Sequence, residues 1–191
     1  MTDKEIFLDI CKNEIHRDGI DKLLDWLVKS DFFTAPASTK YHGNFEGGLC
    51  AHSLNVYRTL KDLCEKYFPE ASQETIAIVG LFHDFCKINF YKMGSRNVKD
   101  EASGQWIKKD VWEIDEKIPL GHGEKSCIIL QWYIKLSVEE LLAIRWHMGG
   151  FDTAVKGGDH GLNGAQYYSK LVVLLHAADI LASNLMEDTV K

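Results

Sequence analysis

Six ionisable side chains stand at positions where apolar segments of the sequence would otherwise exclude them. They interrupt apolar helices or lie at glycine-marked helix ends, and they are His52, His83, Asp84, His122, His147 and Asp179. A carboxylate that leaves water costs several kcal/mol, roughly, unless a positive group meets it. Imidazole and carboxylate together suit borderline transition metals, so this set predicts a site for iron, manganese, nickel, cobalt or zinc.

The pair His83-Asp84 is the strongest part of the pattern, because it lies near the end of an almost wholly apolar segment. A single histidine at a helix end is more often a capping or core residue than a ligand, so each histidine keeps that alternative. Asp84 and Asp179 are harder to explain structurally, since aspartate is seldom buried unpaired. His176, three residues before Asp179, is interpreted as a core residue, with a role beside the ligands left open.

Residues that could meet a substrate flank this set. Lys87 follows Asp84 by three residues and shares its helix face, where it is either a phosphate-binding group or a solvated helix end. The loop at residues 31–47 leads into the next helix and is either one wall of the site or an ordinary surface loop. Its candidate substrate-binding side chains are Tyr41, His42 and Asn44.

The composition is that of a globular chain of 191 residues with a formal net charge of −6. This charge argues against a general nucleic-acid-binding surface, although one cluster of cations could still hold a phosphate. The five cysteines are scattered without a C-x-x-C pair, which argues against a thiolate zinc site and fits a reducing cytosol. The sequence shows neither a signal peptide nor a bilayer-spanning segment, so we expect a soluble cytoplasmic protein with no membrane partner.

Apolar periodicity predicts an all-α fold with a small β-hairpin insertion at about residues 89–118. The hairpin carries aromatic residues, which make it either a lid over the site or a contact between two copies in a homodimer. We expect one domain over residues 1–191, in which N-terminal helices and a connecting loop (1–46) precede a metal-binding helical core (47–187). The expected helices cover residues 3–16, 19–30, 48–68, 72–88, 119–135, 137–148 and 164–187.

Five stretches carry a familiar order of residues, H…HD…H…H…D. They are GGLCAHS (47–53), LFHDFCK (81–87), GHG (121–123), WHMGG (146–150) and LHAAD (175–179). The order resembles that of the HD-domain superfamily of metal-dependent phosphohydrolases, over roughly residues 40–187. It is most similar to the HD module of certain bacterial 3′–5′ exoribonucleases, which share the Gly-Gly-Leu…His and Gly-His…His-x-Gly elements.

The resemblance implies an all-α fold around one or two divalent metal ions, and a metal-activated water that attacks phosphorus. By analogy, Asp84 bridges two ions and is catalytic together with Lys87, which binds a phosphate oxygen. The ligands implied for the first ion are His52, His83, Asp84 and Asp179, and those for the second are His122 and His147 with Asp84.

Two other functions are compatible with the same ligands. Some HD-fold proteins use a di-iron centre to activate oxygen, and others could sense a nucleotide without catalysis. The chain has no room for the separate oligonucleotide-binding domain of the exoribonucleases, so no dedicated nucleic-acid-binding domain is expected. A nucleotide or another small phosphate ester is therefore the expected substrate. Cys86 stands where many HD domains have glycine, and a residue this small is not expected to disturb the site.

Overall fold

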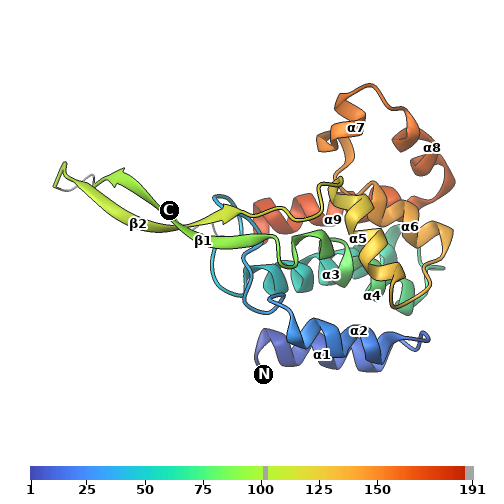
Figure 1. Cartoon of the computed structure of the whole chain (residues 1–191). Coiled ribbons are helices and arrows are strands. Elements are labelled where there is room, and N and C mark those ends of the chain that lie inside the picture. Colours follow the sequence, from blue (N-terminus) through green and yellow to red (C-terminus); the bar gives the residue numbers. More distant parts are fainter. Residues whose placement is uncertain (101–102, 188–191) are drawn as a thin grey trace.

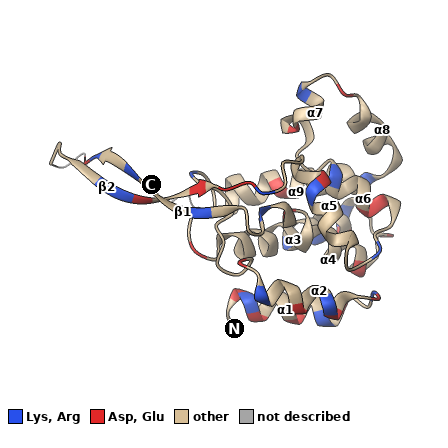
Figure 2. Ribbon diagram, in the orientation of Figure 1, with Lys and Arg blue, Asp and Glu red and all other residues tan. Residues whose placement is uncertain are grey.

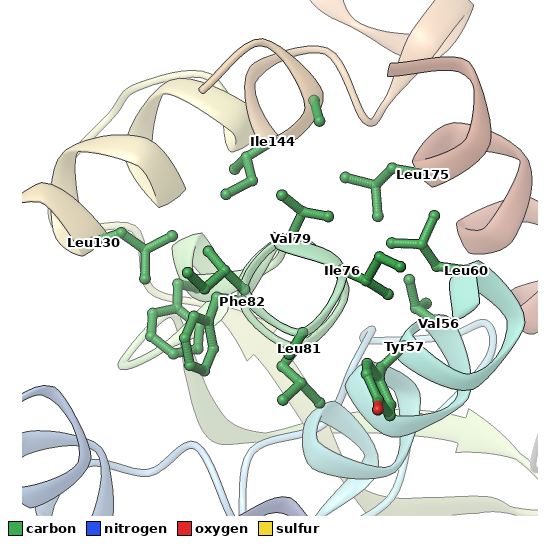
Figure 3. Packing of buried hydrophobic residues seen from close by; sticks show 14 of the residues in the cluster. Val56, Tyr57, Leu60, Ile76, Val79, Leu81, Phe82, Leu130, Ile144 and Leu175 are labelled. Carbon is green, nitrogen blue, oxygen red and sulfur yellow. The ribbon is translucent and has the colours of Figure 1, made fainter. Parts of the chain in front are cut away.

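The computed structural model describes residues 1–100 and 103–187, and helix α4 (Gln73–Phe82) lies at the centre of its helical bundle. Every residue of α4 from Ile76 to Phe82 is buried, because this segment is apolar on all sides. Figure 3 looks along α4 and shows the helices that surround it. Their contributing side chains include Val56 and Leu60 of α3 (Gly48–Tyr67), Leu130 of α5 (His122–Gln131), Ile144 of α6 (Val138–Arg145) and Leu175 of α9 (Lys170–Leu181).

The remaining helices pack outside this bundle (Figure 1). Helices α1 (Asp3–Glu14) and α2 (Ile20–Lys29) lie along one side, where Phe7, Leu23 and Leu27 join the same hydrophobic cluster as the bundle. The short α7 (Thr153–Lys156) and α8 (Gly161–Tyr168) stand on the opposite side. Three short helical segments are not α-helical. The segments η1 (Phe85–Lys87) and η2 (Gly149–Phe151) are 3-10 helices, and η3 (Ala182–Met186) is a π-helix.

The predicted hairpin insertion is confirmed. Strand β1 (Tyr91–Lys99) pairs antiparallel with β2 (Trp106–Ile114), and the hairpin projects away from the helices as an arm (Figure 1). Its base is tied to the body where the Tyr91 hydroxyl donates to the Ala37 carbonyl oxygen at 3.2 Å. Figure 2 shows positive and negative residues mixed along the arm. The lid and dimer interpretations both stay predictions.

Several expected helix ranges are wrong. The helices expected at 119–135 and 137–148 are shorter in the structure, as α5 (His122–Gln131) and α6 (Val138–Arg145), and two other expected helices are broken. The helix expected at 164–187 is broken at Ser169, whose extended backbone and side-chain cap on the Leu171 N–H start α9 afresh, 108° away from α8. The helix expected at 72–88 ends at Phe82, because the backbone at Asp84 turns out of the helical region (φ −104°, ψ 24°). Neither break carries a glycine or a proline, so the residues that commonly mark the end of a helix gave no sign of them. The boundary of α3 and the capping box at Ser137 and Glu140 are confirmed.

No single helix among residues 1–100 and 103–187 has the length and apolarity to cross a bilayer. The bent pair formed by α8 and the continuous segment Lys170–Met186 meets the length and composition criteria only when both helices are counted together.

Arg17 joins the N-terminal helices to the bundle through a network of ion pairs. Its guanidinium donates to both carboxylate oxygens of Glu140 at 2.6 and 3.1 Å, and to Glu74 at 2.9 Å. Glu140 is wholly buried and also accepts the backbone N–H of Ser137 at 2.7 Å. The buried carboxylate therefore depends on Arg17 for its balancing charge.

We predict that Arg17→Met lowers the free energy of unfolding by about 3–5 kcal/mol at neutral pH, because Glu140 would keep a buried charge without its cation. Arg58→Met, at an exposed position of α3, is the matched control and should change it by less than about 0.5 kcal/mol. Urea denaturation of both variants measures the difference. Equal effects of the two substitutions would contradict the role given to Arg17.

The Arg17 network also predicts that the free energy of unfolding depends on pH. Burial favours the neutral form of Glu74, but hydrogen bonds from Arg17 and the His16 N–H outweigh it and hold the pKa of Glu74 below its ordinary 4.5. Such a carboxylate stabilises the fold above its unfolded-state pKa, and the contribution is lost as the pH falls through the folded-state pKa. The stability difference between wild type and Arg17→Met should therefore narrow below about pH 4.5, as followed by urea denaturation at several pH values.

Gly80 lets α3 and α4 approach each other closely. A Cβ atom at this position would lie 2.8 Å from the Cα of Tyr57. We predict that Gly80→Ala lowers the free energy of unfolding by about 1–3 kcal/mol through overpacking. Gly164→Ala in α8 is the control, because its Cβ would meet open space and alanine favours a helix by up to about 1 kcal/mol. The midpoint of thermal unfolding should therefore fall for Gly80→Ala and rise for Gly164→Ala.

Candidate metal centre

The ends of four helices bring most of the predicted ligands to one place. His52 lies in the second turn of α3, and His83 and Asp84 follow directly after the last residue of α4. His147 comes two residues after α6 ends, and Asp179 lies near the end of α9. Helices α3 and α6 pack on α4, and α9 packs on α3 and α6, so the residues meet although they are far apart in the sequence.

Asp84 is the hub of the cluster. Its Oδ2 atom lies 3.6 Å from Nε2 of His52 and 3.6 Å from Nε2 of His83, and its Oδ1 atom lies 3.6 Å from Nε2 of His147. The same Oδ2 is 2.7 Å from the ammonium nitrogen of Lys87. His52, His83 and Asp84 each offer a ligand atom within 4.8 Å of the others.

Two of the three buried imidazoles are oriented by their own helix ends. Nδ1 of His83 donates to the Gly80 carbonyl oxygen at 2.9 Å, and Nδ1 of His147 donates to that of Ile144 at 2.7 Å. This fixes the tautomer in which Nε2 carries a lone pair, and that atom faces Asp84. Nε2 of His147 is buried, and among the described residues it has no hydrogen-bond partner, since 3.6 Å to Asp84 is too long.

Asp179 closes the opposite side of the cluster. Its Oδ1 atom lies 3.3 Å from Nε2 of His52 and accepts a hydrogen bond from the Ser183 hydroxyl at 3.2 Å. Nε2 of His52 is also 3.2 Å from Nε2 of His83. Two imidazole nitrogens at this distance need either a proton on one of them or a cation between the ligands.

His122 approaches Asp84 from a different direction, at the first residue of α5. Its Nδ1 atom is 3.2 Å from the thiol sulfur of Cys86, and Asp84, Cys86 and His122 each offer a ligand atom within 4.8 Å of the others. Burial raises the pKa of the Cys86 thiol, so it stays protonated and can donate a weak hydrogen bond. Cys86 therefore does more than replace a glycine, since it contacts a predicted ligand.

The charges of the cluster suit a cation. Burial favours neutral carboxyls, but Lys87 and His83 hold the pKa of Asp84 well below its ordinary value, and His52 does the same for Asp179. Burial lowers the pKa of His83 to about 4, which leaves this imidazole neutral at pH 7.

Lys87 and His52 keep their protons in the absence of a metal. Burial disfavours the charged form of Lys87, but Asp84 outweighs it and raises the pKa of the ammonium group. Burial likewise disfavours protonated His52, but its hydrogen bonds to Asp179 and Glu187 raise its pKa to about 9. A cation that binds at Nε2 of His52 therefore displaces a proton.

A cavity of about 230 Å³ opens on this cluster. Its polar lining includes Lys87, His42, Asp84, His122, His176 and Asp179, and its apolar lining includes Met148, Phe151 and Ile180. Tyr41 is 67% exposed, and neither Tyr41 nor Asn44 is among the described residues that line the cavity. Their predicted role in substrate binding stays a prediction.

His176 belongs to the site, where the sequence favoured a core residue. Its Nδ1 atom donates to the carbonyl oxygen of His147 at 2.7 Å, and its ring packs against Gly149. Gly149 has a positive φ of 52°, and a Cβ there would lie 2.4 Å from the ring of His176. The first glycine of the WHMGG stretch is therefore required by this packing.

The donor set fits a divalent transition metal. Imidazole nitrogens and ionised carboxylates converge, backbone carbonyls fix the orientation of His83 and His147, and a buried nitrogen of His147 lacks a partner in the described chain. Asp84 has one oxygen toward His52 and His83 and the other toward His147.

A sequence model of the HD domain matches residues 49–184, which is more than half of the chain. Neither the curated proteins nor the solved structures gave a match to this sequence. HD domains bind divalent metals and are in general metal-dependent hydrolases, and the match spans the whole histidine and aspartate cluster. This protein is a member of the HD domain family.

Proposed function

We propose that this protein hydrolyses phosphate esters, such as a nucleotide or another small phosphoester, with one or two divalent metal ions. The observation that carries the proposal is the buried Asp84 carboxylate, which lies between three imidazoles and beside the Lys87 cation at the floor of a cavity. The cavity's volume of about 230 Å³ suits a small ester better than a long polymer. The family membership makes hydrolysis the favoured class of reaction.

We propose two groups of ligands that share Asp84. The first would be His52, His83, Asp84 and Asp179, and the second would be His122 and His147 with Asp84. The short distances from His52 to Asp179 and from His147 to Asp84 support this division. Bound metal would polarise a phosphoryl oxygen and lower the pKa of a water molecule. The metal is iron, manganese, nickel, cobalt or zinc, since mixed imidazole and carboxylate ligands accept all of these.

Lys87 is proposed to bind the phosphoryl group. Its ammonium group lies in the cavity lining, and Asp84 keeps it protonated. A cation fixed beside the reacting phosphorus stabilises the negative charge that grows on the oxygens in the transition state. His42 also lines the cavity, where burial and the neighbouring His52 lower its pKa, so we propose it as a neutral hydrogen-bonding group for substrate.

Two other activities use the same residues. A di-iron oxygenase and a non-catalytic nucleotide sensor would both need the cavity, and the first would also need the bridging Asp84. The similarity to the HD module of bacterial exoribonucleases, the cytoplasmic location and the homodimer are likewise predictions that await a direct test.

We predict that the purified protein contains one or two equivalents of a divalent transition metal and releases phosphate or a phosphate monoester from a panel of nucleotide substrates. Elemental analysis and phosphate release measure these outcomes. Treatment with a chelator should abolish hydrolysis, and a divalent metal should restore it. Iron-dependent oxygen consumption without hydrolysis of any phosphoester would instead favour the oxygenase.

We predict that Lys87→Met lowers kcat/KM for the best phosphoester by about 100-fold while metal content stays unchanged, because the substitution removes a transition-state cation but no ligand. Lys92→Met is the matched control, since this exposed lysine on the hairpin pairs only with Asp115 among the described contacts. Asp84→Asn should lose metal as well as activity. Undiminished activity of the metal-loaded Lys87→Met variant would rule out the proposed role.

A further inference from the structure

His52 is held by a different kind of partner from the other buried histidines. Nδ1 of His83 and of His147 donates to a backbone carbonyl oxygen three residues earlier in the chain. Nδ1 of His52 instead lies 2.9 Å from a carboxylate oxygen of Glu187, which is 135 residues away in the sequence. The side chain of Glu187 is only 5% exposed.

The surroundings of Glu187 favour a functional role for this contact. Its Oε1 atom accepts from Nδ1 of His52 and also from the side-chain amide of Asn55 at 3.3 Å. Its Oε2 atom is buried, and among residues 1–100 and 103–187 it has no hydrogen-bond partner. A buried carboxylate oxygen without a partner costs free energy, so the packing of this segment alone does not explain an acidic residue here.

The segment that carries Glu187 also contacts a second predicted ligand. Ser183, in the π-helix η3, donates its hydroxyl to Oδ1 of Asp179 at 3.2 Å. Ser183 and Asn184 both line the cavity. The turn from Ser183 to Glu187 therefore touches His52 on one side and Asp179 on the other. Single-turn π-helices are frequent at functional sites, because they redirect side chains at the end of a helix.

We propose that Glu187 is a positioning residue of the metal centre, whose carboxylate holds the His52 ring so that Nε2 is presented to the metal. The proposal rests on the metal centre of the proposed function. A carboxylate on the far nitrogen of a ligating imidazole fixes the tautomer and ring orientation, and it makes the ligating nitrogen a stronger donor. Ser183 orients the Asp179 carboxylate in the same way, through the oxygen that faces His52.

One competing arrangement uses the same residues. His42, His52 and Glu187 each offer a ligand atom within 4.8 Å of the others, so Glu187 could itself ligate an ion together with Nδ1 of His52. Two contacts favour a network of side-chain hydrogen bonds at this position over a metal ion. Asn55 donates to Oε1 of Glu187, and the Ser183 hydroxyl lies 3.4 Å from Nε2 of His42. The test below separates the two.

The experiment compares Co²⁺ binding by wild type, Glu187→Ala and Glu187→Gln, with Glu65→Ala at an exposed position of α3 as the control. Competition with a chelating dye gives the dissociation constant, visible absorption reports the coordination number, and thermal unfolding of the metal-free protein reports folding. Loss of an outer partner of a ligating histidine weakens metal binding by about 10–100-fold. We expect this increase in Kd for Glu187→Ala, and a smaller one for Glu187→Gln, whose amide oxygen still accepts from Nδ1.

Several outcomes would overturn the proposal. An unchanged Kd in Glu187→Ala would remove the positioning role, and so would a weakened Kd that merely follows unfolding of the metal-free protein in both variants. An equal loss in Glu187→Gln and Glu187→Ala, with an altered absorption spectrum, would make Glu187 a ligand instead. A wild-type protein that binds Co²⁺ but hydrolyses no phosphoester would refute the proposed function and leave this inference standing.

Discussion

The constraint on which the structure depends is a carboxylate buried among imidazoles. Asp84 lies just after the end of the apolar helix α4, where burial on its own raises the carboxyl pKa and favours the neutral form. The Lys87 ammonium nitrogen, 2.7 Å away, balances part of the negative charge of Asp84. The Nε2 atoms of three histidines lie 3.6 Å from its carboxylate oxygens. Helices α3 and α6 pack on α4, and α9 packs on both of them, so the packing of the bundle also assembles the site.

The bundle places the site by making helices end there. His83 and His147 each follow the end of a helix, where the last carbonyl oxygens have no partner within the helix. Each imidazole satisfies such a carbonyl through Nδ1, and the same bond directs its Nε2 atom toward Asp84. For each of these histidines, one hydrogen bond therefore both caps the helix end and orients the ligand.

Much of this could be predicted from the sequence, because a histidine or aspartate within an apolar helix is locally visible. The six residues of the pattern could be picked out from the chain alone, because they interrupt apolar helices or lie at glycine-marked helix ends, and the structure brings His52, His83 and His147 to within 3.6 Å of Asp84. The break at Ser169 was not visible, because no glycine or proline marks it and the extended conformation is stabilised by contacts with Glu139 and Leu171. Periodicity reports which face is buried but does not report where the backbone bends.

Glu187 shows a second limit of sequence reasoning. An acidic residue near a helix end, followed by Asp188, looks like any solvated residue, and only the fold brings it to His52 across 135 positions. The predicted ligands were recognisable because their own surroundings are apolar, whereas their partners lie in segments whose local composition is ordinary. The residues that orient a metal site are for this reason harder to find from sequence than the ligands, although they act on the same atoms.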